Sequence, residues 1–165
     1  MNNLTVNVSS NLGGTTNITG NVSQQIGSTN NTQYGYNALT NLTDSSSNTA
    51  IGYKTMASNT TGSCNTSIGD FSLNKNTSGE YNTAVGHYSS INNTTGVSNT
   101  SIGSNSLQSN TTGNGNTCIG YSTGTSITSE INNTCLGSQS DISSGYTNST
   151  AIGYKSKCTA SIRSC

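Results

Sequence analysis

A five-residue phrase that ends in an aliphatic residue and a glycine returns along this chain at a nearly fixed spacing. One copy reads Asn48-Thr49-Ala50-Ile51-Gly52, and the closing glycine recurs 17 residues later six times and then 16 residues later. The glycines of this series are Gly35, Gly52, Gly69, Gly86, Gly103, Gly120, Gly137 and Gly153. A fixed period of this length is typical of a solenoid, in which each repeat is one supersecondary unit that stacks on its neighbours.

The alternation inside the phrase predicts a short β-strand rather than a helix, because Thr49 and Ile51 must point away from Ala50. The glycine then permits a sharp turn. A second turn signal, close to Asn-Thr-Thr-Gly, begins at Asn59 and also steps by 17 residues. We therefore predict an all-β fold, a parallel β-roll or β-helix solenoid of about eight 17-residue coils, stacked about 4.8 Å apart.

The aliphatic residue before each glycine is predicted to fill the interior of the roll, helped by a leucine or methionine four residues after the glycine. These expected core rungs are Ile51, Ile68, Val85, Ile102, Ile119, Leu136 and Ile152. The residue two before the glycine is small in nearly every copy, as at Ala50 and Ser67. Such a smooth strip favours close approach of a second chain, and we expect it to be a subunit interface in a ring of three chains.

The repeat divides the chain into three segments. Residues 31–157 form the predicted β-roll, and residues 158–165 form a C-terminal tail. Residues 1–30 lack the phrase, but Leu4, Val6 and Val8 alternate with polar residues, which indicates a short strand. This segment either caps the first coil or docks on another subunit by adding to an open sheet edge.

Composition and charge exclude several classes of function. Leu, Ile, Val and Phe make up about 15% of the chain, which is typical of disorder, but the strict register argues against it. Five acids balance five bases, so no electrostatic footprint for nucleic acid is present, and no apolar run is long enough to span a membrane. A single histidine and acids scattered over different coils predict neither an enzyme nor a metal site or cofactor.

The cysteines and the glycosylation sequons each leave alternatives open. Cys118 and Cys135 occupy one column on adjacent coils, so they are disulfide candidates; they can equally be small hydrophobic residues at alanine positions or thiols at a subunit interface. Cys158 and Cys165 flank the tail and could clamp it or link to a neighbouring chain. Asn-x-Ser/Thr sequons begin at Asn59, Asn76, Asn93 and Asn110, where asparagine also suits turns and stacked ladders.

Two stretches resemble a known family. Asn-Thr-Ala-Ile-Gly-Tyr-Lys-Thr (48–55) and Ser-Thr-Ala-Ile-Gly-Tyr-Lys-Ser (149–156) are similar to the head repeats of trimeric autotransporter adhesins, and similar repeats occur in fibre-like proteins of phages and large viruses. The resemblance covers about three-quarters of the chain, residues 31–157. It implies a homotrimeric β-roll, exposed outside the cell on a virion or a bacterial surface.

The expected function is therefore that of a structural surface fibre or adhesin head, which assembles with itself as a trimer or a head-to-tail filament. Recognition of a host receptor or glycan would use the variable positions just after each glycine. That candidate recognition row consists of Tyr36, Tyr53, Asp70, His87, Tyr121 and Tyr154, with Lys54, Phe71, Tyr88 and Lys155 beside it. The alternative is an ice-binding solenoid that uses the threonine ladder at Thr49, Thr66, Thr83, Thr100, Thr117 and Thr134. We expect this ladder to share the inward face of the isoleucines.

Overall fold

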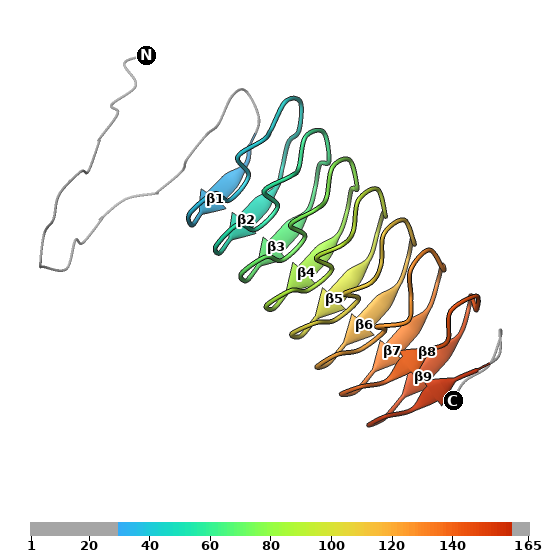
Figure 1. Cartoon of the computed structure of the whole chain (residues 1–165). Coiled ribbons are helices and arrows are strands. Elements are labelled where there is room, and N and C mark those ends of the chain that lie inside the picture. Colours follow the sequence, from blue (N-terminus) through green and yellow to red (C-terminus); the bar gives the residue numbers. More distant parts are fainter. Residues whose placement is uncertain (1–29, 160–165) are drawn as a thin grey trace, which may run out of the picture.

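The computed structural model describes residues 30–159, which form one stack of coils with no helix among them. Eight short parallel strands lie one above the other along the stack (Figure 1). They are β1 (Thr32–Tyr34), β2 (Thr49–Ile51), β3 (Thr66–Ile68), β4 (Thr83–Val85), β5 (Thr100–Ile102), β6 (Thr117–Ile119), β7 (Thr134–Leu136) and β9 (Thr150–Ile152). The predicted all-β parallel solenoid with a 17-residue period is confirmed.

The register of the sheet follows directly from the sequence period. Ala50 pairs with Ser67 and Ile51 pairs with Ile68, and every later strand repeats this alignment. The 16-residue step is absorbed between β7 and β9, where Leu136 still pairs with Ile152. Equivalent residues of successive coils therefore form straight columns along the axis.

The glycine column makes the corner that follows each strand. Gly103 has a φ of 129°, and a Cβ built on it would lie 2.2 Å from the carbonyl oxygen of Gly120 in the next coil. The corner therefore needs glycine for its backbone conformation and for the close approach of the next coil. Beyond the corner, residues two and four positions after the glycine also adopt left-handed conformations, as Lys54 and Met56 do with φ of 51° and 46°.

The two faces of the strands are reversed relative to the sequence prediction. From β2 onward, the small residue at the centre of each strand of this sheet is buried inside the roll, with Ala50, Ser67 and Cys118 all at 0% exposure. The aliphatic column points outward. The predicted core rungs Ile51, Ile68, Ile102, Ile119 and Ile152 are exposed, and Val85 and Leu136 are half-buried. The prediction that this column fills the roll is wrong, and so is the prediction that the small residues line an outer interface.

The narrow interior explains this reversal. Inside the roll, the small residue of the strand faces the small residue three positions after the glycine. The Thr55 and Ser67 hydroxyl oxygens lie 2.7 Å apart, and those of Ser67 and Ser72 lie 2.8 Å apart. An isoleucine in place of Ser67 could not fit between these walls. The interior instead takes its large apolar side chains from the column four after the glycine, where Leu39, Met56, Leu73 and Leu107 are buried as predicted.

The last coils depart from the regular pattern. A second, two-stranded sheet pairs β8 (Asp141–Ile142) with β10 (Lys157–Cys158). Ile127 and Ile142 fill the interior here, whereas Ile131 is exposed. Of the predicted end segments, the structure describes only Asn30 and residues 158–159; their proposed capping and docking roles fall on the remaining residues, outside the described range. The described part contains no helix long and apolar enough to cross a membrane.

Candidate functional site: the outer sheet face and its corner

The outer face of the eight-stranded sheet carries two straight columns of side chains. One is the threonine that begins each strand, and the other is the aliphatic residue that ends each strand from β2 onward, whereas β1 ends in Tyr34. Ile51, Ile68, Ile102 and Ile119 expose 36–38% of their surface, and Ile152 in the last strand exposes 57%. We call these two columns the Thr/Ile face. It is an apolar column flanked by threonine hydroxyl groups, and it follows the strands that lie one above the other in Figure 1.

An asparagine ladder inside the roll holds the Thr/Ile face in register. Asn65 precedes β3, and its Nδ2 crosses the interior to donate to the Gly79 carbonyl oxygen at 2.8 Å. Its Oδ1 accepts the backbone N–H of Asn82 in the next coil at 2.9 Å. Each such side chain thus closes its own coil and aligns the next one. The buried members are Asn31, Asn48, Asn65, Asn82, Asn99, Asn116 and Asn133.

A second asparagine ladder runs beneath the Asn-Thr-Thr-Gly turns. Asn76 donates to Asn59 Oδ1 at 2.8 Å, Asn93 donates to Asn76 at 2.9 Å, and Asn110 donates to Asn93 at 2.9 Å. The ladder ends because Ile127 occupies the next position, which leaves Asn110 Oδ1 buried without a hydrogen-bond partner. All four asparagines are fully buried, so their sequons are closed to glycosylation in the fold, and the ladder interpretation is confirmed.

The candidate recognition row lies on the corner beside the Thr/Ile face. All six of its residues, Tyr36, Tyr53, Asp70, His87, Tyr121 and Tyr154, are exposed. The structure brings only the N-terminal members together. The rings of Tyr36 and Tyr53 stack at 5.8 Å between centroids, and Tyr53 packs edge-on against Phe71 at 5.2 Å.

This aromatic strip continues through the neighbouring column. The ring of Phe71 lies 5.3 Å from that of Tyr88, and Tyr88 lies 3.9 Å from His87. Lys54 Nζ sits 5.3 Å from the centre of the Tyr53 ring, a cation–π distance. Lys155 and Tyr154 form a similar but separate pair in the last coil, 5.0 Å apart. The corner is therefore aromatic in its first four coils and mostly polar beyond them.

Glu130 is a buried acid that sequence analysis did not identify as structural. Its carboxylate accepts the backbone N–H groups of Thr128, Ser129 and Gly145 at 2.5, 2.9 and 2.7 Å. Burial favours a raised pKa, but these donors outweigh it and lower the pKa of Glu130 to about 2. Glu130 stands where the earlier coils place the glycine of Asn-Thr-Thr-Gly. It fastens the irregular turn to the coil that follows.

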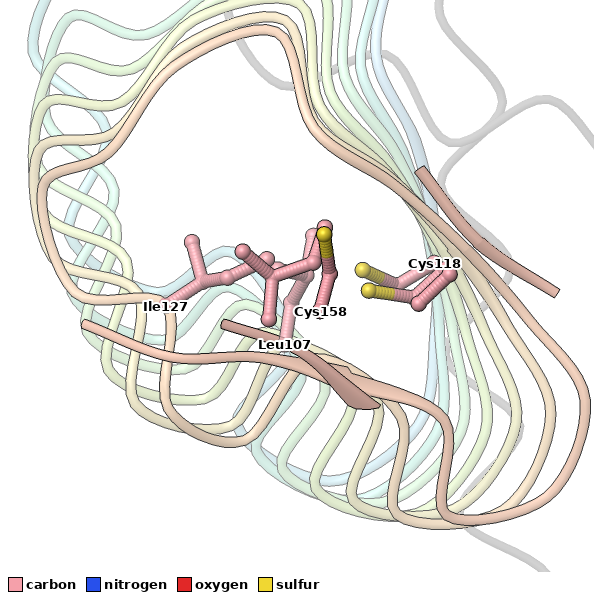
Figure 2. Close-up of a cluster of buried hydrophobic side chains, with 7 residues drawn as sticks. Leu107, Cys118, Ile127 and Cys158 are labelled. Atoms are coloured by element: carbon pink, nitrogen blue, oxygen red, sulfur yellow. The ribbon is translucent and has the colours of Figure 1, made fainter. Parts of the chain in front are cut away.

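The candidate cysteines are partly brought together. Cys118 and Cys135 are register partners on β6 and β7, both buried, and Cys158 joins the same apolar cluster (Figure 2). No disulfide links the cysteines within residues 30–159. Cys165 lies outside the described residues, and Cys64 is exposed two residues before β3.

Among the described residues, no group of three or more His, Cys, Asp or Glu side chains is placed to hold a metal ion. A scan against protein-family models, a search of curated proteins and a search of solved structures each returned no match.

Proposed function

We propose that this chain is a structural, self-assembling protein of a surface fibre or adhesin head, in which three copies pack through their Thr/Ile faces. The observation that carries the proposal is the outward aliphatic column, with four isoleucines at 36–38% exposure in one straight line. Parallel sheets normally have both faces covered, and contiguous apolar stripes mark interaction surfaces. A second copy is the natural cover, because its own columns repeat at the same spacing.

A closed ring is favoured over end-to-end stacking by the way the asparagine ladder ends. In the last coil the ladder position is Ser149, whose Oγ donates to the Thr147 carbonyl oxygen at 3.0 Å. Serine has no carboxamide to offer to a further coil. A head-to-tail filament through the edge strands β1 and β9 would therefore lack the carboxamide bond that every internal step has. Packing side by side leaves the ladders intact.

In such an assembly the aromatic part of the corner, which runs from Tyr36 to Tyr88 and which we call the aromatic corner, would face outward beside the buried Thr/Ile face. Its exposed tyrosines and Lys54 offer hydroxyl, aromatic and cationic groups to a receptor or a glycan on a host surface. The scaffold would thus carry variable residues on rigid, repeated corners. This arrangement suits attachment outside the cell, on a virion or a bacterial surface.

Analytical ultracentrifugation of the full chain and two lysine variants tests the assembly. Ile102 on β5 and Ile131, which lies outside the sheet three residues before β7, have nearly equal exposure, 38% and 39%. We expect the wild type and Ile131→Lys to sediment near three times the chain mass of 16.9 kDa, and Ile102→Lys to sediment as a monomer that keeps its β-sheet circular dichroism. A wild type that is monomeric at every concentration, or an Ile102→Lys variant that still assembles, would sink the proposal.

A second candidate function, ice binding, is favoured by the outward position of the threonine column. The threonine column was expected to point inward, but Thr49, Thr66 and Thr100 are half-exposed on the outer face. Hydroxyl and methyl groups there repeat at one coil spacing on a regular surface. Thermal hysteresis of the purified protein tests this candidate: freezing-point depression beyond the colligative value supports it, and its absence at millimolar concentration removes it.

A further inference from the structure

Three buried cysteines gather at the point where the roll is least like its other coils. Cys118, Cys135 and Cys158 share an apolar cluster with Leu107, Ile127, Ile142 and Ala151. In Figure 2 the sulfur of Cys118 points into the interior from the sheet wall, while Ile127 and Cys158 extend toward it from other parts of the coil. Neither the proposed assembly nor the exposed corner uses these thiols.

The backbone separation of Cys118 and Cys135 lies within the range that a disulfide spans. They are directly paired on adjacent parallel strands, where neighbouring backbones lie about 4.8 Å apart; disulfides span Cα separations of roughly 4.4 to 6.8 Å. Both side chains point into the roll. The neighbouring Cys135 thiol, together with burial, raises the pKa of Cys118 well above its ordinary value.

The local packing gives the pair a structural use. The apolar column four after the glycine is interrupted here by Gly124 and Asp141, so these coils lack the leucine or methionine of the earlier ones. A Cβ on Gly124 would lie 2.4 Å from Cys118 Sγ, which means that the sulfur occupies the room that a larger side chain would need. A covalent bond between β6 and β7 would tie two coils together where the regular coil pattern gives way to an irregular one.

We propose that Cys118 and Cys135 are closed into a disulfide while the chain folds, by exchange with a low-molecular-weight disulfide such as oxidised glutathione. One cysteine thiolate attacks the reagent, whose S–S bond breaks and releases one thiol, and a mixed disulfide forms. The second cysteine attacks the protein sulfur of that mixed disulfide and releases the second thiol. Two protein thiols are oxidised by two electrons, the reagent is reduced to two thiols, and the two protons end on those thiols.

The bond must form before the coils close. In the folded roll both cysteines are 0% exposed, and a thiol in apolar surroundings is a poor nucleophile because little of it is thiolate. Chains that fold reduced should therefore stay reduced at this pair. Oxidant present during folding, rather than afterwards, decides whether the bond forms.

Refolding the full chain in two ways tests this inference. Reduced, denatured protein is diluted into buffer containing oxidised glutathione; in parallel, protein already folded under reducing conditions receives the same reagent. Both samples are then acid-quenched, alkylated in denaturant and digested after Glu and Lys. Cleavage after Glu130 separates Cys118 from Cys135, and cleavage after Lys155 and Lys157 separates Cys135 from Cys158.

We expect fragment 81–130 to be linked to fragment 131–155 in the refolded sample, and the same link to form at least about tenfold more slowly in the folded sample. The Cys158→Ser variant should keep the link, and Cys64→Ser serves as a matched surface control. Recovery of β-sheet circular dichroism without the link, a bond from Cys158 in its place, or equally fast oxidation of the folded protein would each overturn the inference. The digest of the wild-type protein shows whether Cys118 and Cys135 become linked during folding, even if a variant fails to fold.

Discussion

At the scale of single residues, polar side chains rather than large apolar ones hold this fold together. Each asparagine of the ladder that precedes the strands makes one bond across its own coil and one to the next coil, and these asparagines are all buried. A buried donor or acceptor that loses its partner costs the full desolvation energy of that group. The ladder should therefore be sensitive to single substitutions that remove no apolar area at all.

Asn82→Ala tests this sensitivity. The substitution leaves the Gly96 carbonyl and the Asn99 backbone N–H without their side-chain partners, which lie at 2.8 and 2.9 Å. We expect the free energy of unfolding to fall by about 3 kcal/mol, measured by urea denaturation. Asn92→Ala is the matched control: Asn92 is half-buried and bonds the Gln108 carbonyl, which water can reach, so the loss there should stay below about 1 kcal/mol. If both variants lost the same free energy of unfolding, the buried ladder would contribute no more to stability than a half-buried hydrogen bond does.

Glu130 predicts a specific dependence of stability on acid. Its folded pKa of about 2 lies below the ordinary value of 4.5, so its contribution is complete above pH 4.5 and is lost as the pH falls toward 2. The difference of about 2.5 units corresponds to an upper limit of about 3 kcal/mol. Glu130→Gln should lower the unfolding free energy at pH 7 and leave a shallower decline in acid. Glu80→Gln, at a half-exposed acid, should leave the loss of stability in acid unchanged. If Glu130→Gln lost stability in acid as steeply as the wild type, the attribution of this pH dependence to Glu130 would be refuted.

At the scale of the strand and its corner, the glycine is required by its neighbour in the next coil as much as by its own backbone. Gly103 and Gly153 share a column and have φ of 129° and 114°, yet a Cβ on Gly153 would meet nothing within 4 Å. Gly103→Ala should therefore destabilise the roll by more than about 3 kcal/mol, whereas Gly153→Ala should show only the backbone strain of about 1–3 kcal/mol. Thermal unfolding followed by circular dichroism compares the two variants. Similar unfolding midpoints would mean that the clash of the Gly103→Ala side chain with the next coil is relieved at little cost in stability.

The same element shows what the sequence could and could not predict. The strands, their register and the corners could be predicted from the 17-residue period, because residues at equivalent positions of successive repeats stack on one another and form columns. It could not determine which strand face is interior. Ala50 and Ile51 alternate under either assignment, and the hydrophobic preference for burying isoleucine was overridden by the Ser and Thr hydroxyls that close the interior opposite the strand.

Glu130 illustrates a second limit of the sequence. A single acid in a variable turn carries no periodic signal, and its three backbone donors include Gly145, fifteen residues away. Only the fold of the irregular coil brings that donor within reach. By contrast, the exposure of the recognition row could be predicted, since the variety of residues just after each glycine is typical of a surface column.

At the scale of the whole molecule, the reversal of the strand faces moves the expected interface without removing it. The small-residue strip is inside the roll, and the apolar Thr/Ile face takes its place on the outside. The buried asparagines of both ladders are hydrogen-bonded within one chain, whereas the outer isoleucines are left with partial exposure. In the proposed assembly the Thr/Ile face is covered by neighbouring copies, and the aromatic part of the corner stays open to other partners.

Thiol labelling of the assembled protein tests that central claim most directly. Ile102→Cys and Ile131→Cys are each placed in a chain that carries Cys64→Ser and Cys165→Ser, and the modification rate with a maleimide is followed by mass spectrometry. The two positions have nearly equal exposure in the single chain, 38% and 39%. We expect rapid labelling at residue 131. Labelling at residue 102 should be at least about tenfold slower, because in the proposed trimer a neighbouring copy covers residue 102. Equal rates at the two positions, in a protein of trimeric mass, would contradict the assignment of the Thr/Ile face as the interface.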